Sequence, residues 1–215
     1  YRTKTVLEIF ENRDPRLAQT FMKPGVLNVG TTEPHRAKLN LGGYPQIKFR
    51  PLTFDQMDWG KSYTDLPIIR YDEILLIYAE AKAELGTLTQ DDINNTINLI
   101  RQRAGMPDAS LDDWLANIDP VQEERYSNVQ SSQKGAVLEV RRERRIELAC
   151  EGFRYGDLMR WGCGKLFEAA PEGAYIPGMG YYPVTGDGTP DIAVGEKKAD
   201  VDKKPEEDKQ KYKLT

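Results

Sequence analysis

The chain has 215 residues, 39% of them hydrophobic, and a formal net charge of -4, which suits one substantial core. The mild acidic balance gives no reason to expect nucleic acid, because a phosphate-binding surface needs an excess of lysine and arginine. No apolar run approaches the roughly twenty residues of a membrane-spanning helix, so we expect the chain as given to be soluble.

Residues 1–67 are rich in glycine and proline and are expected to form ordered loops. Within them lies the run NRDPRL, residues 12–17. Asp14 precedes a proline and is therefore held in an extended or turn conformation. Arg13 and Arg16 can pair with it. We interpret this run as structural.

Aromatic side chains are concentrated in residues 44–63 and make this stretch the candidate ligand site. A sugar presents apolar C–H faces and a ring of hydroxyl groups, so its site needs flat aromatic rings beside short polar groups. The candidate residues are Tyr44, Asp58, Trp59, Lys61 and Tyr63. The alternative is that the aromatic rings anchor a long loop on the helices.

Residues 68–105 are predicted to form a helical hairpin. Its first arm carries apolar residues at helical spacing and ends at Gly86. These residues are Tyr71, Ile74, Leu75, Tyr78, Ala81 and Leu85. A short connection to a second helix requires antiparallel packing, and a single hairpin has to stack on others to bury both of its faces.

The second arm begins at Thr89, whose hydroxyl can cap the first turn, with Asp92 three residues further on. Its apolar stripe is Ile93, Ile97, Ile100 and Ala104, and Gly105 ends it. Across the hairpin, we expect Glu80 to face Arg101 or Arg103.

The most highly charged stretch lies in residues 135–170, which are predicted to form two helices. Arg144 falls on the apolar stripe of the first helix and needs a carboxylate, because an unpaired buried charge is costly. Glu143, Glu147 and Glu151 form a row at intervals of four, and Gly152 ends the helix. Such a row can be read as the acid and base of a hydrolase, and the arginines as a nucleic-acid patch. Pairing within the helix is the reading we adopt.

Residues 143–162, ERRIELACEGFRYGDLMRWG, resemble the signature of the SusD/RagB family, E-R-R-x-E-L-x-x-E-G-x-R-x-x-D-L-x-R-W-G. The matched positions include Glu143, Arg144, Arg145, Glu147, Glu151, Gly152, Arg154, Asp157, Arg160 and Trp161. Residues 70–81 and 98–105 resemble two further patterns of this family, R-x-x-E-x-x-L-x-x-A-E-A and N-x-x-R-x-R-A-G.

The resemblance implies a mainly α fold of tetratricopeptide-like helical hairpins with long ordered loops. Within it, the chain would be a single C-terminal domain, residues 1–215, with the N-terminal half of the protein absent. Its parts would be a loop-rich segment (1–67), the hairpin (68–105), the signature helices (135–170) and an irregular tail (171–215).

The resemblance also implies the function: a non-catalytic binding protein on the outer membrane of Bacteroidetes that captures glycans and delivers them to a SusC-like TonB-dependent transporter. Attachment would be through a lipid anchor in the missing N-terminal part. The alternative cargo is peptide, as in the RagB branch. Two other classes remain open, a helical scaffold that binds only proteins and a glycoside hydrolase.

Cofactor and nucleophile chemistry has little support, because His35 is the only histidine and Cys150 and Cys163 are the only cysteines. We expect no cofactor, with calcium at residues 185–191 as a minor alternative. Cys150 is expected to be a small buried residue, and a disulfide with Cys163 is neither required nor excluded.

Large aromatic side chains outside the candidate site are interpreted as core. These are Trp114, Phe153 and Trp161.

Overall fold

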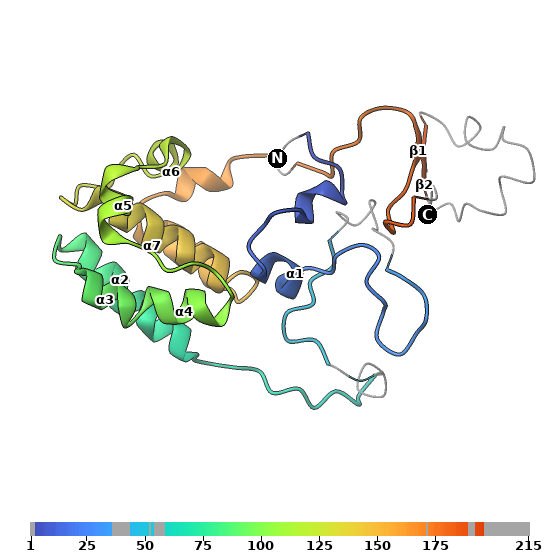
Figure 1. Ribbon diagram of the computed structural model, residues 1–215, viewed down its shortest axis with the longest axis horizontal. Helices are drawn as coiled ribbons and strands as arrows, with labels where there is room; N and C mark the ends of the chain where they lie inside the picture. Colours follow the sequence, from blue (N-terminus) through green and yellow to red (C-terminus); the bar gives the residue numbers. More distant parts are fainter. Residues whose placement is uncertain are drawn as a thin grey trace, which may run out of the picture. The chain divides into compact units, whose positions relative to one another are not determined.

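A computed structural model describes residues 3–35, 44–51, 53, 59–170, 172–188 and 192–195 (Figure 1). The chain divides into two compact units. The helical unit comprises Asp14–Arg16 and Leu66–Ala170, and the loop-rich unit comprises Tyr1–Arg13, Leu17–Asp65 and Pro171–Thr215.

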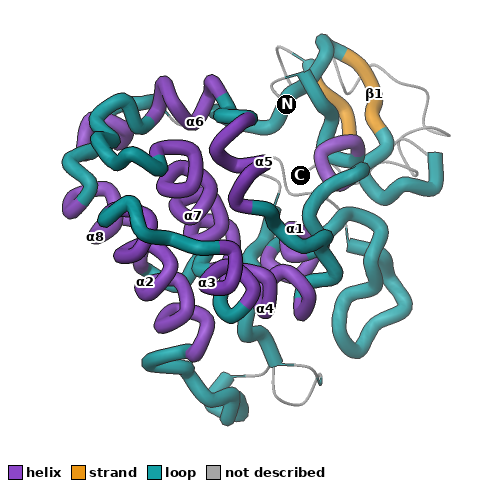
Figure 2. The backbone as a smooth tube through the Cα atoms, turned by 60° about the vertical axis from the view of Figure 1, so that its left-hand side comes forward, coloured by secondary structure: helices purple, strands orange, loops and turns teal. Residues whose placement is uncertain are grey.

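The helical unit is built around helix α7 (Lys134–Glu147), which packs against α2 (Tyr71–Glu84), α4 (Ile97–Arg103) and α5 (Leu111–Ala116). The remaining helices of this unit are α3 (Gln90–Asn94), α6 (Pro120–Arg125), α8 (Phe153–Arg160) and a 3-10 turn at Gly164–Phe167. Figures 1 and 2 both show α2 and α7 side by side. None of the helices in the described part of the chain is long and apolar enough to span a bilayer.

The core of the helical unit lies between α2 and the helices that face it. Close packing of α5 on α7 depends on Gly135, because a Cβ atom there would lie 2.0 Å from the carbonyl oxygen of Trp114. Trp114 and Trp161 are buried as expected, and Phe153 packs against the same core. The α7 residues in this core are Ala136, Val137, Leu138 and Val140.

The predicted start of the second hairpin arm is confirmed. The Thr89 hydroxyl accepts a hydrogen bond from the backbone N–H of Asp92, and the Asp92 carboxylate accepts one from the backbone of Thr89, forming a capping box. The arm is not continuous, because it is interrupted at Asn95 and Thr96 between α3 and α4. There the Thr96 hydroxyl donates a hydrogen bond of 2.6 Å to the carbonyl oxygen of Asp92.

Of the apolar stripe predicted for α2, Leu75 is buried as expected, but the prediction is wrong for the other members, which are exposed. Tyr71, Ile74, Tyr78 and Leu85 are exposed. The buried apolar side chains of this helix are Leu75, Leu76, Ala79 and Ala83. Both sets follow helical spacing because α2 is apolar on two sides, so spacing alone does not tell which set faces the core.

The signature helix ends earlier than predicted. Helix α7 ends at Glu147, and a turn leads to Gly152, which has a left-handed φ of 88° and precedes α8. Cys150 lies in this turn with φ of 65° and is exposed, so its predicted burial is wrong. Because it lies beyond the helix, the helical stripe does not determine its position. Cys150 and Cys163 are both free thiols.

The loop-rich unit contains little regular structure in its described residues. A 3-10 turn at Glu8–Phe10, most of the short helix α1 (Arg16–Thr20) and the strands β1 (Gly180–Tyr182) and β2 (Ile192–Val194) belong to it. The strands pair antiparallel, with Tyr181 opposite Ala193. This hairpin lies in the tail that was expected to be irregular. A small apolar cluster is centred on Val6 and Val184.

Candidate functional site

The aromatic candidates Trp59 and Tyr63 are strongly exposed. Residues 61–67 have no helix or strand, and 97% of Trp59 and 74% of Tyr63 is accessible to solvent. Lys61 between them is also exposed. Asp58 lies outside the described residues. A ring that is buried in a core offers no stacking face, so these two rings satisfy the first requirement of a sugar-binding surface.

Tyr44 has different surroundings. Its ring centroid lies 5.7 Å from that of Phe10, and it packs against the cluster of Val6 and Val184. Burial raises the pKa of its hydroxyl. These contacts give Tyr44 a packing role, and its part in ligand binding stays a prediction.

The buried carboxylates of α7 accept hydrogen bonds from arginines that are distant in the sequence. Glu143 and Glu147 are 4% and 3% exposed. Arg16 Nη1 lies 2.5 Å from Glu143 Oε1 and 3.2 Å from Glu147 Oε2. Arg101 donates to Glu143 at 3.2 Å, and Arg103 donates to both oxygens of Glu147 at 2.7 Å. Charge-assisted pairs of this kind satisfy buried carboxylates.

Arg16 is itself held by the turn that precedes it. Its Nε and Nη2 atoms donate to Asp14 at 3.0 and 2.6 Å, and its backbone N–H donates to the same carboxylate at 2.9 Å. Burial of Asp14 opposes its ionisation, but these hydrogen bonds outweigh burial and lower the pKa of Asp14 below its ordinary value. The structural role predicted for residues 12–17 is therefore explained by these contacts, in which Asp14 holds Arg16 in place to bind the carboxylates of α7.

Arg70 binds the last two carboxylates of the row, Glu147 and Glu151. It binds Glu151 through two hydrogen bonds of 2.8 and 2.9 Å and donates to Glu147 at 2.9 Å. Asp72 also accepts a hydrogen bond from it. Although burial lowers the pKa of Arg70, the two glutamates more than compensate and raise it.

A second group of charges joins α7, α8 and α2. Arg144 Nε donates to both oxygens of Asp157 at 2.9 Å. Arg160 donates to Asp157 at 2.9 Å and forms a fork with Glu80, one arm of which is 2.7 Å long. The indole N–H of Trp161 donates to Glu80 at 2.6 Å. Glu80 thus fixes the end of α8 on α2.

Arginines also stack on the indole ring of Trp161. The guanidinium carbons of Arg141 and Arg160 lie 4.6 and 4.8 Å from the ring centroid, within the range of a cation–π contact. The ring of Tyr126 packs edge-on against the same indole, with 5.7 Å between the ring centroids. Arg154 donates a hydrogen bond of 3.0 Å to the Tyr126 hydroxyl. Arg145, in contrast, is on the exposed side of α7.

Two pairings expected from the sequence are wrong. Glu80 binds Arg160 rather than Arg101 or Arg103, and the carboxylate row of α7 pairs with arginines of other segments rather than within the helix. Glu143 and Glu147 are buried in the structure, and buried carboxylates require cations, which here come from distant segments that the local spacing does not identify.

This charge arrangement is poorly suited to acid–base catalysis. A catalytic carboxyl group has to reach the substrate, whereas Glu143 and Glu147 are buried and hydrogen-bonded to arginines. Glu139 has a raised pKa, caused first by burial, but it lies 3.3 Å from Arg142. It does not line the hollow described next.

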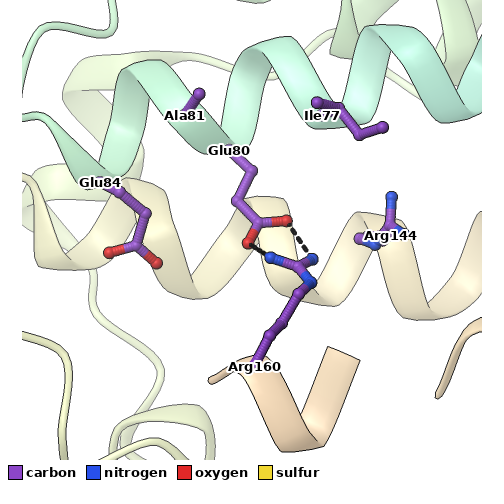
Figure 3. Close-up of a pocket in the computed structure, with 6 residues that line it drawn as sticks. All are labelled: Ile77, Glu80, Ala81, Glu84, Arg144 and Arg160. Atoms are coloured by element: carbon purple, nitrogen blue, oxygen red, sulfur yellow. Dashed lines mark hydrogen bonds and ion pairs between the residues drawn. The ribbon is translucent and has the colours of Figure 1, made fainter. Parts of the chain in front are cut away.

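A hollow of about 410 Å³ lies beside α2 (Figure 3). Its lining residues are Ile77, Glu80, Ala81, Glu84, Arg144 and Arg160. Figure 3 shows the carboxylate of Glu80 and the guanidinium of Arg160 in direct contact, joined by hydrogen bonds. Among the described residues, no group of three or more histidine, cysteine, aspartate or glutamate side chains is arranged to hold a metal ion. Calcium at 185–191 stays a prediction, and residues 189–191 lie outside the described ranges.

Comparison with known proteins gives a consistent answer. The model of the SusD family matches residues 1–214. The chain belongs to the SusD family. The resemblance indicated by residues 143–162 is thereby confirmed. A solved SusD-like carbohydrate binding protein from Bacteroides fragilis is 28% identical, with a TM-score of 0.52, which agrees with the expected mainly α fold. No curated protein matches the chain.

The alignment with the solved protein covers 75% of this SusD-family chain but 31% of the other chain. The chain therefore spans about a third of the length of that relative. In this chain, the residues of the family signature form ion pairs and cation–π contacts. These contacts hold α7 and α8 against α2, α4 and the turn at Arg16.

Proposed function

We propose that this SusD-family chain is part of a non-catalytic glycan-binding protein and that Trp59 provides a stacking face for sugar. The observation that supports this most directly is the exposure of Trp59, 97% in a chain whose solved relative is a carbohydrate binding protein. Exposure of the apolar indole ring to water is unfavourable in free energy. Stacking of an apolar sugar face on the ring removes this surface from water.

Tyr63 and Lys61 extend the proposed contact. The phenol ring of Tyr63 offers a second stacking surface, and its hydroxyl and the Lys61 ammonium offer hydrogen bonds to sugar hydroxyls. Asp58 is proposed as an acceptor in the same stretch. Stacking is tolerant of sugar identity, so we expect moderate affinity for repeated units of a polymer rather than tight binding of a monosaccharide.

Affinity electrophoresis against a panel of soluble polysaccharides tests the proposal. A polymer that binds retards the protein in the gel, and Trp59→Ala should weaken binding by about 1–3 kcal/mol. The melting temperature should not change, because the indole is almost wholly exposed. Tyr155→Ala is the matched control, since Tyr155 is also an exposed aromatic residue but lies on α8.

Equal retardation of Trp59→Ala and the parent protein would refute the assignment of Trp59. Retardation by no polysaccharide, together with quenching of tryptophan fluorescence by a peptide mixture in the parent protein but not in Trp59→Ala, would favour the peptide-binding alternative. Release of reducing ends from a bound polymer would favour a glycoside hydrolase.

We further propose delivery of the glycan to a SusC-like TonB-dependent transporter at the cell outer membrane, with attachment through a lipid anchor outside these residues. Co-purification with such a transporter from detergent-solubilised outer membranes tests this step separately. Recovery of the transporter without any bound polysaccharide in the electrophoresis would support the helical-scaffold alternative.

A further inference from the structure

Three arginines from three different helices come together near the buried side chain of Tyr126. Arg125 ends α6, Arg145 lies in the last turn of α7, and Arg154 lies on α8. Tyr126 directly follows Arg125 and is 1% exposed. None of the three arginines forms an ion pair with a carboxylate in the described ranges, whereas Arg144, the neighbour of Arg145, does.

Arg154 is held in place but keeps unused hydrogen-bonding capacity. Its Nη2 atom donates a hydrogen bond of 3.0 Å to the Tyr126 hydroxyl, and its guanidinium carbon lies 6.0 Å from the ring centroids of Tyr126 and Trp161. Its other terminal nitrogen, Nη1, is buried and has no hydrogen-bond acceptor among the described residues. A buried charged donor without an acceptor is unfavourable in free energy, so Arg154 favours an acceptor from outside.

The charges of the three arginines repel one another. Partial burial is the largest cause that lowers the pKa of Arg145, and the charges of Arg154 and Arg125 lower it further. Arg70 and Arg160 show the opposite direction, because carboxylates beside them raise their pKa. An anion that binds among Arg125, Arg145 and Arg154 would remove this repulsion.

The side-chain chemistry favours an oxyanion as the ligand. A guanidinium group presents planar N–H donors that match two oxygens of a carboxylate, sulfate or phosphate group. Arg145 is exposed, so an ion can approach the cluster from solvent on that side. Because the three arginines belong to three helices, folding brings them together and the unfolded chain has no such site.

We propose that Arg125, Arg145 and Arg154 form a binding site for an oxyanion, which is either a free ion or the sulfate or carboxylate substituent of an acidic polysaccharide. This site lies in the helical unit, whereas the aromatic candidates of residues 44–63 belong to the loop-rich unit. The polysaccharide source rests on the proposed glycan-binding function, and the anion site itself does not.

Thermal unfolding of the full chain in sodium sulfate tests the proposal. Sodium chloride of equal ionic strength is the reference, because screening by salt also affects exposed charges. An ion that binds the folded state raises the melting temperature with a dependence on concentration that follows its affinity. We expect Arg125→Gln and Arg145→Gln each to weaken the apparent affinity for sulfate at least about tenfold, since each removes a charge-assisted contact.

Lys23→Gln is the matched control, because it removes the same charge from an exposed residue of the loop-rich unit. Its response to sulfate should equal that of the parent protein, which also corrects for general stabilisation of proteins by sulfate. In sodium chloride, Arg125→Gln and Arg145→Gln should remain folded, because neither arginine has an ion pair in the described ranges to lose.

Stabilisation by sulfate that both arginine variants lose and Lys23→Gln keeps supports the proposal. Equal responses of the parent and both arginine variants would overturn it. Loss of the folded state in both variants would also overturn it, because the arginines would then be structural. Trp59→Ala should respond to sulfate as the parent does, so the failure of the Trp59 assignment and the failure of the anion site are distinguishable.

Affinity electrophoresis in chondroitin sulfate and in polygalacturonate identifies the source of the anion in a protein that responds to sulfate. Retardation of the parent that Arg145→Gln loses supports an acidic polysaccharide as the ligand. Retardation by neither polymer, or retardation that Arg145→Gln keeps, supports a free ion as the ligand.

Discussion

Removal of one charge at the centre of the α7 network is the sharpest test of its structural role. Glu147→Gln keeps the size of the side chain and removes its negative charge. Glu147 accepts hydrogen bonds from Arg16 at 3.2 Å, Arg70 at 2.9 Å and Arg103 at 2.7 Å. With 3% of Glu147 exposed, water does not replace the lost charge.

The expected loss of stability depends on how many carboxylates each arginine still contacts after the substitution. Breaking a buried pair by removing one partner costs about 3–5 kcal/mol. Arg16 and Arg70 each keep at least one other carboxylate, and half of the Arg103 side chain is already exposed. We therefore expect the lower end of this range, about 3 kcal/mol, which corresponds to a fall in melting temperature of about 6–12 °C.

Urea denaturation followed by the helical circular dichroism signal measures this loss. Glu123→Gln is the control, because Glu123 and Lys134, which pair at 2.7 Å, are 47% and 30% exposed, so the pair should be worth less than about 1 kcal/mol. If Glu147→Gln changes the free energy of unfolding no more than Glu123→Gln does, the network does not stabilise the fold as argued.

Other predictions concern packing, pH and arginine geometry. Gly135→Ala should lower the free energy of unfolding by about 1–3 kcal/mol in urea because its Cβ clashes with the α5 backbone, whereas Gly156→Ala, with open space around it, should be neutral or stabilising. Burial of Asp92 opposes its ionisation, but hydrogen bonds led by that from Thr89 lower its pKa from 3.8 to about 2. Urea titrations should therefore show the advantage of the parent over Asp92→Asn in full above about pH 4 and lost as the pH falls toward 2. Arg160→Lys should lower the melting temperature, since lysine cannot form the bidentate contact or stack equally on the indole, with a cost of about 1 kcal/mol.

Local signals in the sequence were sufficient where a feature depends on neighbouring residues. The capping box of Thr89 and Asp92 requires only a spacing of three, and the structure contains it. The family signature likewise identified the fold, because its residues are those that fasten the helices together. The burial of Trp114 and Trp161 followed from size and hydrophobicity.

Features that depend on distant segments were not predictable from local spacing. Glu80 and Arg160 are 80 residues apart, so no helical periodicity relates them. The orientation of α2 was also undetermined, because both of its faces are apolar and only contact with α7 distinguishes them. The hairpin of β1 and β2 is three residues per strand, too short to give an alternating pattern.

The segment Asp14–Arg16 is grouped with the helices although the residues on both sides of it belong to the loop-rich unit. Its partner Glu143 is 127 residues further along the chain. At about 5–20 residues per second of synthesis, Arg16 waits on the order of ten seconds before that partner exists. During this interval α7 is absent and the turn at Arg16 cannot bind it, so completion of the helical unit is a late event and follows the synthesis of α7.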